Sequence, residues 1–141
     1  MHYIHYQERK THGTSNFPVG FYHVSRLHPQ YAMPYHWHEE LELIRILQGC
    51  FEVTADDSAR RLSEGDILVV NSGSLHGGSP QDCVYECLVF PPSFLLLKNH
   101  LSPFLTALNS GQIRLEEFFP AGSSSEIPGT VHRLFQAAKD S

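Results

Sequence analysis

Two imidazoles and a carboxylate of equal parity occur close together in the sequence, at His36, His38 and Glu42. Side chains of equal parity lie on one face of a β-strand, and alternate residues are about 7 Å apart. One strand here would therefore bring all three toward a single ion, which imidazole nitrogen binds at about 2.0–2.1 Å. We expect His76, which follows a second apolar run and a tight turn, to complete the set from a neighbouring strand.

The surroundings of Glu42 favour a role inside the fold. The residue lies between Leu41 and Leu43 and close to Ile44 and Ile46, and an unpaired carboxylate buried among such neighbours would be costly. A metal ion would remove that cost, whereas the alternative is a solvated surface carboxylate. A donor set of nitrogen and oxygen without thiolate suits Zn, Ni, Fe or Mn, and no pattern indicates an organic cofactor.

From Phe17 onward the chain shows short runs rich in Val, Ile, Tyr and Phe, separated by turn residues. This pattern predicts an all-β sandwich or barrel. The expected strands are 21–26, 40–48, 50–54, 66–71 and 83–90, with turns at 56–58, 63–66, 72–74 and 77–80. After Pro91-Pro92 we expect short helices over 93–101 and from Ser102, a strand over 112–119 and a last helix capped by Ser125.

That last helix carries an apolar stripe, because Val131, Leu134, Phe135 and Ala138 fall at i, i+3, i+4 and i+7. Either the stripe packs back on the barrel, or it awaits further chain beyond Ser141. We divide the chain into a flexible arm (1–16), a barrel (17–120) and the start of a C-terminal helical segment (121–141), which we interpret as truncated.

Chain length, net charge and cysteine spacing indicate a single domain and argue against DNA-binding, membrane-spanning and disulfide-rich proteins. A chain of 141 residues suits one domain, and its net charge of −5, with no basic cluster beyond Arg60-Arg61, argues against DNA binding by this segment alone. No apolar run is long enough to span a membrane. Cys50, Cys83 and Cys87 contain no Cys-x-x-Cys pair, so we expect free thiols in a cytoplasmic protein.

The ligand spacing resembles that of the cupin superfamily, whose motifs have the forms G-x5-H-x-H-x3,4-E-x6-G and G-x5-P-x-G-x2-H-x3-N. The first motif is matched at His36, His38, Glu42 and Gly49, and the second at Gly65, Gly73 and His76. The leading glycine of the first motif is absent, Asn71 replaces the proline, and Pro80 stands where the family has asparagine. The resemblance implies an all-β, jelly-roll-like cupin barrel followed by short helices.

Within that superfamily, residues 21–97 are similar to the N-terminal domain of AraC-type transcription regulators. The similarity covers residues 35–42, 47–49, 65–73 and 88–95. It implies a barrel that binds a small-molecule effector, a sugar in some members, beneath an N-terminal arm. It also implies helices that form a homodimer, and a separate C-terminal domain that binds DNA.

The same resemblance suggests effector-binding residues at Arg26 and at Tyr85 or Cys87. The alternatives are a salt bridge at the rim for Arg26 and a half-buried barrel aromatic for Tyr85. Two other functions stay open at this point. A stand-alone metal-dependent enzyme, such as a dioxygenase or sugar isomerase, would use the same four ligands. A barrel that binds nothing would serve only dimerisation.

Overall fold

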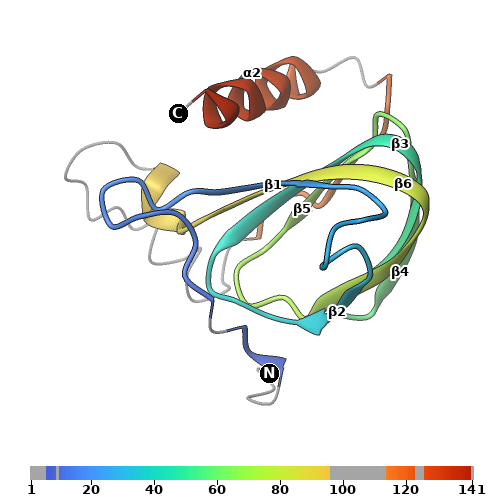
Figure 1. Cartoon of the computed structure of the whole chain (residues 1–141), viewed down its shortest axis with the longest axis horizontal. Coiled ribbons are helices and arrows are strands. Elements are labelled where there is room, and N and C mark those ends of the chain that lie inside the picture. Colours follow the sequence, from blue (N-terminus) through green and yellow to red (C-terminus); the bar gives the residue numbers. More distant parts are fainter. Residues whose placement is uncertain (1–5, 9, 96–113, 123–125, 141) are drawn as a thin grey trace.

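The computed structural model describes residues 6–8, 10–95, 114–122 and 126–140, which form an antiparallel barrel with a helix beside it (Figure 1). The predicted all-β barrel with short helices is confirmed. The strands are β1 (Gly20–Val24), β2 (Met33–His36), β3 (Leu41–Ala55), β4 (Ser58–Ser63), β5 (Ile67–Val70), β6 (His76–Phe90) and β7 (Phe118–Phe119). The helices are a 3-10 turn, η2 (Pro92–Leu95), and α2 (Ile127–Lys139).

The barrel is built around β3 and β6, which are 15 residues long each and pair antiparallel along their length. In the sheet order β1-β6-β3-β5-β7, β2 also pairs with β6 and β4 with β3. The predicted strands 40–48 and 50–54 are one continuous strand. Gly49, with φ +75°, lies where the register between β3 and β6 shifts, so this glycine produces a bulge where a break was expected.

The turn predicted at 77–80 is wrong, because these residues belong to β6. A Cβ atom on Gly78 would overlap the carbonyl oxygen of Glu52 and the ring of Phe51 on the paired strand β3. The glycine therefore allows close contact between two strands. Strands β2 and β4 were not predicted, since β4 (Ser58–Ser63) is mostly exposed and lacks an apolar run.

The two faces of the sheet carry separate apolar clusters. The inner face buries Ile44 and Ile46 of β3 together with Tyr85 and Cys87 of β6. Residues of opposite parity on the same strands, such as Leu88, belong to the outer cluster. This alternation is why Glu42 faces the interior while its neighbours Leu41 and Leu43 face outward.

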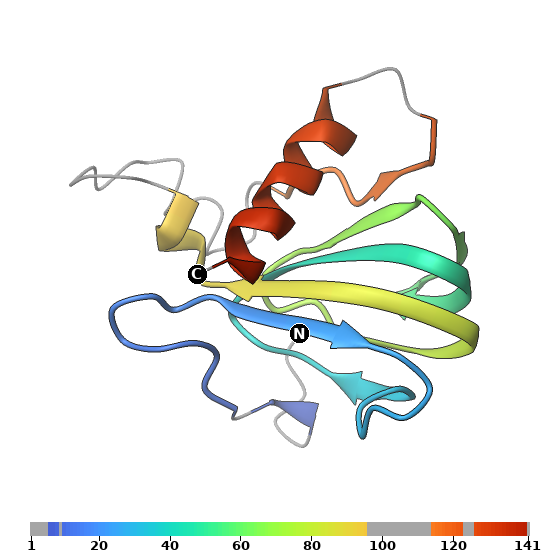
Figure 2. The ribbon, with the colours of Figure 1, turned by 45° about the horizontal axis from the view of Figure 1, so that its top comes forward.

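Helix α2 packs across the outer face of the sheet, beside β1 and β6 (Figure 2). Its Val131 and Phe135 are buried against Leu41, Ile67 and Leu88. Of the two interpretations of the apolar stripe, packing on the barrel is therefore the one observed, although Leu134 stays 38% exposed. The expected cap, Ser125, lies outside the described residues, and Glu126 precedes the helix.

The structure describes only part of the helices and the strand that were predicted after residue 92. Of the helix expected over 93–101, the structure describes the turn at 92–95, and the helix from Ser102 lies outside the described residues. Of the strand expected over 112–119, residues 118–119 form β7 and 114–117 are irregular.

The three cysteines are free, as expected. Within the described part of the chain, no helix has the length and apolar character needed to cross a membrane.

Candidate metal centre and pocket

The four predicted ligands lie together, and their donor atoms are all within 4.8 Å of one another. The expectation that one strand supplies three ligands and a neighbouring strand the fourth is wrong. His36 ends β2, His38 follows in the connection, Glu42 is the second residue of β3, and His76 begins β6. The cluster still forms because β6 pairs with both strands, and His36 lies directly opposite His76 in the register.

All three imidazoles are oriented in the same way by the backbone. The Nδ1–H group of His36 donates to the carbonyl of Pro34 (2.8 Å), that of His38 to Glu40 (3.0 Å), and that of His76 to Ser74 (2.8 Å). A carbonyl oxygen can only accept, so each Nδ1 carries the hydrogen. The three Nε2 atoms are therefore the ring nitrogens that face a common centre and could bind a metal ion. Metal-binding histidines usually show this arrangement.

Glu42 provides the oxygen of the cluster. Its Oε1 lies 3.0 Å from Nε2 of His38 and 3.3 Å from Nε2 of His76, and the residue is only 3% exposed. Burial alone would raise the pKa of Glu42, but the hydrogen bonds and charges of His38 and His76 bring it well below its usual value. Burial lowers the pKa of His38, but the bond to Glu42 outweighs it and raises that pKa to about 9. The carboxylate is therefore ionised.

These residues fit a divalent metal ion. Three imidazole nitrogens and one carboxylate oxygen converge, and each imidazole is held by a backbone acceptor. The donor set suits Zn, Ni, Fe or Mn. It does not choose among them.

The cluster lies in the wall of a cavity of about 340 Å³ inside the barrel. This volume is in the range of pockets for small molecules, roughly 300–1,000 Å³. His36, His38 and Glu42 line the cavity, and its remaining wall is largely apolar or aromatic. That wall includes Tyr22 and Val24 of β1, Met33 of β2, and Tyr85, Cys87 and Val89 of β6. The cavity can therefore enclose the apolar body of a small ligand.

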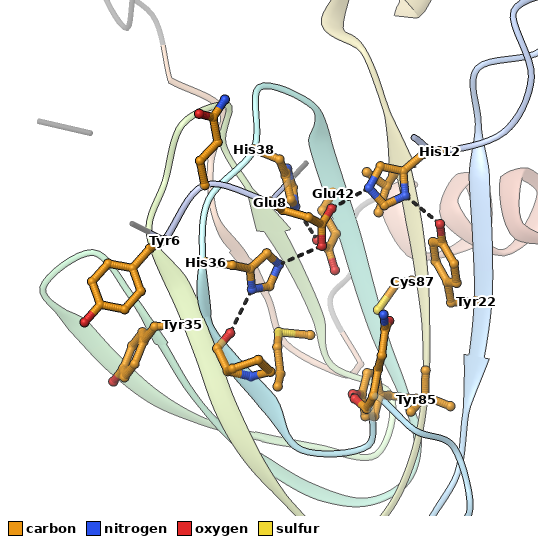
Figure 3. A pocket seen from close by; sticks show the side chains of 16 residues that line it. Tyr6, Glu8, His12, Tyr22, Tyr35, His36, His38, Glu42, Tyr85 and Cys87 are labelled. Atoms are coloured by element: carbon orange, nitrogen blue, oxygen red, sulfur yellow. Dashed lines mark hydrogen bonds and ion pairs between the residues drawn. The ribbon is translucent and has the colours of Figure 1, made fainter. Parts of the chain in front are cut away.

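The N-terminal segment also lines the cavity (Figure 3). Glu8 accepts a hydrogen bond from Nε2–H of the buried His12, whose Nδ1 bonds the Tyr22 hydroxyl, and Oε2 of Glu8 lies 3.8 Å from Nε2 of His36. Burial raises the pKa of Glu8, but the bond from His12 and the nearby histidines outweigh it and lower the pKa. Burial also raises the pKa of Tyr22 to about 12, so this hydroxyl stays protonated.

Of the two residues expected to bind an effector, one lines the cavity and the other does not. Tyr85 lines the cavity, and its hydroxyl donates to the carbonyls of Gln30 (3.1 Å) and Tyr31 (3.0 Å). Arg26 lies outside the cavity lining. Its side chain is 76% exposed and pairs with Asp82 at 3.2 Å, the salt bridge that was the alternative interpretation.

Sequence reasoning did not find Glu8, His12 or Tyr22 as pocket residues. The family resemblance implied an arm over the pocket, but Glu8 and His12 belong to a polar segment without periodicity, so no pattern identified these two residues. Tyr22 has the parity of Val24, which faces inward on the same strand, and strand alternation was a usable signal for it.

Comparison with known proteins agrees with this architecture. Residues 18–107 match the model of the AraC-like ligand binding domain. A Bacillus subtilis protein named "Uncharacterized HTH-type transcriptional regulator YdeC" is 30% identical over 111 residues, which are 73% of this chain. The chain spans only 38% of that relative's length.

Solved structures similar to the barrel include two cupins. One is an RmlC-like cupin with a double-stranded β-helix fold from Methanocaldococcus jannaschii, with 20% identity, a TM-score of 0.43 and coverage of 55% of this chain and 72% of the other. The second is a cupin protein from Bacteroides fragilis, with 20% identity, a TM-score of 0.43 and coverage of 60% and 73%.

Proposed function

The chain belongs to the family of AraC-like ligand-binding domains, and from this premise we propose that its barrel senses a small-molecule effector with the help of a bound divalent metal ion. The metal ligands are His36, His38, Glu42 and His76, and Tyr85 lies in the wall that contacts the effector. The ion would act as a Lewis acid toward an oxygen of the bound molecule. The protein's own residues orient the imidazoles and exclude water around the carboxylate.

One observation carries this proposal. Each of the three histidines donates Nδ1–H to a backbone carbonyl, so that all three Nε2 atoms face a buried carboxylate at the wall of the cavity. Histidines that only fill a core do not need a shared orientation of this kind.

The output of the proposed sensor is DNA occupancy. Binding that favours one of two arrangements of the domain shifts their populations by the difference in affinity. DNA would be contacted by a separate helix-turn-helix domain, as the name of the Bacillus subtilis relative suggests, and residues 121–141 would lead into a homodimer interface. Such a regulator works in the cytoplasm.

Titration of zinc into the metal-free protein, followed by calorimetry, tests the metal centre. We expect one ion per chain, and Glu42→Gln should weaken zinc binding by at least about 100-fold, because loss of even a supporting partner costs about 10–100-fold. Glu40→Gln is the matched control, since its side chain lies outside the cluster. Equal affinity in all three proteins would refute the metal centre.

A turnover assay on the zinc-loaded protein distinguishes a sensor from an enzyme. A dioxygenase or isomerase with this site would show turnover of its substrate that disappears in His36→Ala. A sensor has affinity but no rate to lose, so we expect effector binding without product formation, measured by mass spectrometry of the ligand recovered after incubation.

A further inference from the structure

The carboxylate of Glu8 reaches into the cavity from outside the barrel. Its Oε2 lies 3.8 Å from Nε2 of His36, the atom that would bind the ion, while its other oxygen accepts from His12 (Figure 3). His12 is 7% exposed and is itself held by the hydroxyl of Tyr22. A carboxylate is thus bound in a prepared position, although no motif of the barrel includes it.

The backbone of this segment explains how Glu8 reaches that position. The amide of Glu8 donates to the carbonyl of Trp37 (2.8 Å), and the amide of Trp37 donates to the carbonyl of Tyr6 (2.9 Å). Trp37 lies between the ligands His36 and His38. Movement of Glu8 is therefore coupled to the segment that carries two of the four ligands.

Charge identifies the kind of molecule that can replace Glu8. Among the described residues that line the cavity there is no lysine or arginine, and the acidic groups are Glu8 and Glu42. A divalent ion bound beside Glu42 would leave one net positive charge, which Glu8 would neutralise. A ligand that removes Glu8 without supplying a negative charge would leave the site unbalanced in a partly apolar environment.

We propose that Glu8 is an internal substitute for the carboxylate of the effector, so that the pocket takes small carboxylic acids with an apolar body, which displace Glu8. This inference rests on the proposed function and names its ligand class. The carboxylate accepts the hydrogen bond from His12 and lies beside His36, and the apolar body contacts Met33, Val89 and the tyrosines of the cavity. A neutral sugar matches the volume but not the charge.

Calorimetric titration of benzoate and benzamide into the zinc-loaded protein tests the proposal. The two probes share a shape and differ in charge. We expect Glu8→Ala and Glu8→Gln to bind benzoate at least about tenfold more tightly than the wild type, because the competing carboxylate is removed and hydrogen bonds to charged groups are strong. Benzamide should bind all variants weakly and alike. Glu64→Ala, at an exposed glutamate, should behave as the wild type.

Three results would overturn the inference: equal benzoate affinity in the wild type and both Glu8 variants, benzamide binding as tight as benzoate, or no benzoate binding by any variant. Failure of the metal centre is recognised separately, because the wild type would then retain no zinc. The benzoate comparison is in that case made on metal-free protein, where His12 and His36 still face the position of Glu8. The tenfold difference there would support the inference, and its absence would overturn it.

Discussion

At the scale of single residues, the positions of the candidate metal ligands could be predicted from local spacing, whereas the role of Gly78 could not. The parity of His36, His38 and Glu42 predicted the cluster, although the three residues lie on two strands and their connection. Gly78 was assigned to a turn because glycine commonly marks turns, yet its function depends on the ring and carbonyl of the paired strand. A contact between strands far apart in sequence leaves no local pattern.

We expect Gly78→Ala to destabilise the protein by roughly 1–3 kcal/mol, because the added Cβ overlaps the backbone of Glu52, which cannot move without breaking the β3–β6 pairing. Gly129→Ala is the control. It lies in α2, where an added Cβ would make only an ordinary van der Waals contact with the Arg133 side chain (3.7 Å), and there the helix propensity of alanine should stabilise by up to about 1 kcal/mol. Urea unfolding measures both, and similar effects of the two changes would contradict the proposed contact.

At the scale of elements, the sheet buries only part of the apolar stripe of α2. Val131 and Phe135 are buried against the sheet, while Leu134 of the same stripe remains 38% exposed. Helical periodicity predicted the stripe, but the width of the contact depends on the outer face formed by Leu41, Ile67 and Leu88.

Phe135→Ala should lower the free energy of unfolding by roughly 3–5 kcal/mol, because it leaves a cavity under the helix and removes the ring that Arg45 covers at 4.4 Å. Leu134→Ala, one position away, should cost less than about 1 kcal/mol. Thermal unfolding followed by circular dichroism compares the two variants. Equal losses would mean that α2 does not pack on the barrel through Phe135.

At the scale of the whole molecule, one buried carboxylate connects four elements. Glu86 of β6 has no exposed surface and bonds His23 of β1 (2.7 Å), Arg45 of β3 (2.7 Å) and Lys139 of α2 (3.0 Å). Burial raises the pKa of Glu86, but these three partners outweigh it and hold the pKa below the usual 4.5. The ion pairs thus link the barrel to the helix that follows it.

Because the pKa of Glu86 is lower in the folded state, its contribution to stability is present above pH 4.5 and is lost as the pH falls through the folded-state value. We expect Glu86→Gln to cost on the order of 3 kcal/mol at pH 7, and this difference from the wild type should shrink as the pH falls below 4.5. Glu52→Gln, which disrupts an exposed pair with Arg61, should cost little at any pH. A difference for Glu86→Gln that is independent of pH would refute this account. Urea unfolding across the pH range measures it.

The sequence by itself determined the all-β class, the inward parity of β3 and β6, the clustering of the four candidate ligands and the amphipathic helix. These follow from local spacing, since strand and helix periods are properties of neighbouring residues. Only the tertiary structure decided that Glu8 and His12 reach the cavity, that Arg26 pairs with Asp82 at the rim, and that Gly78 lies inside a strand. Each of these depends on contacts between distant segments, which are determined by packing and charge in three dimensions and have no period in the sequence.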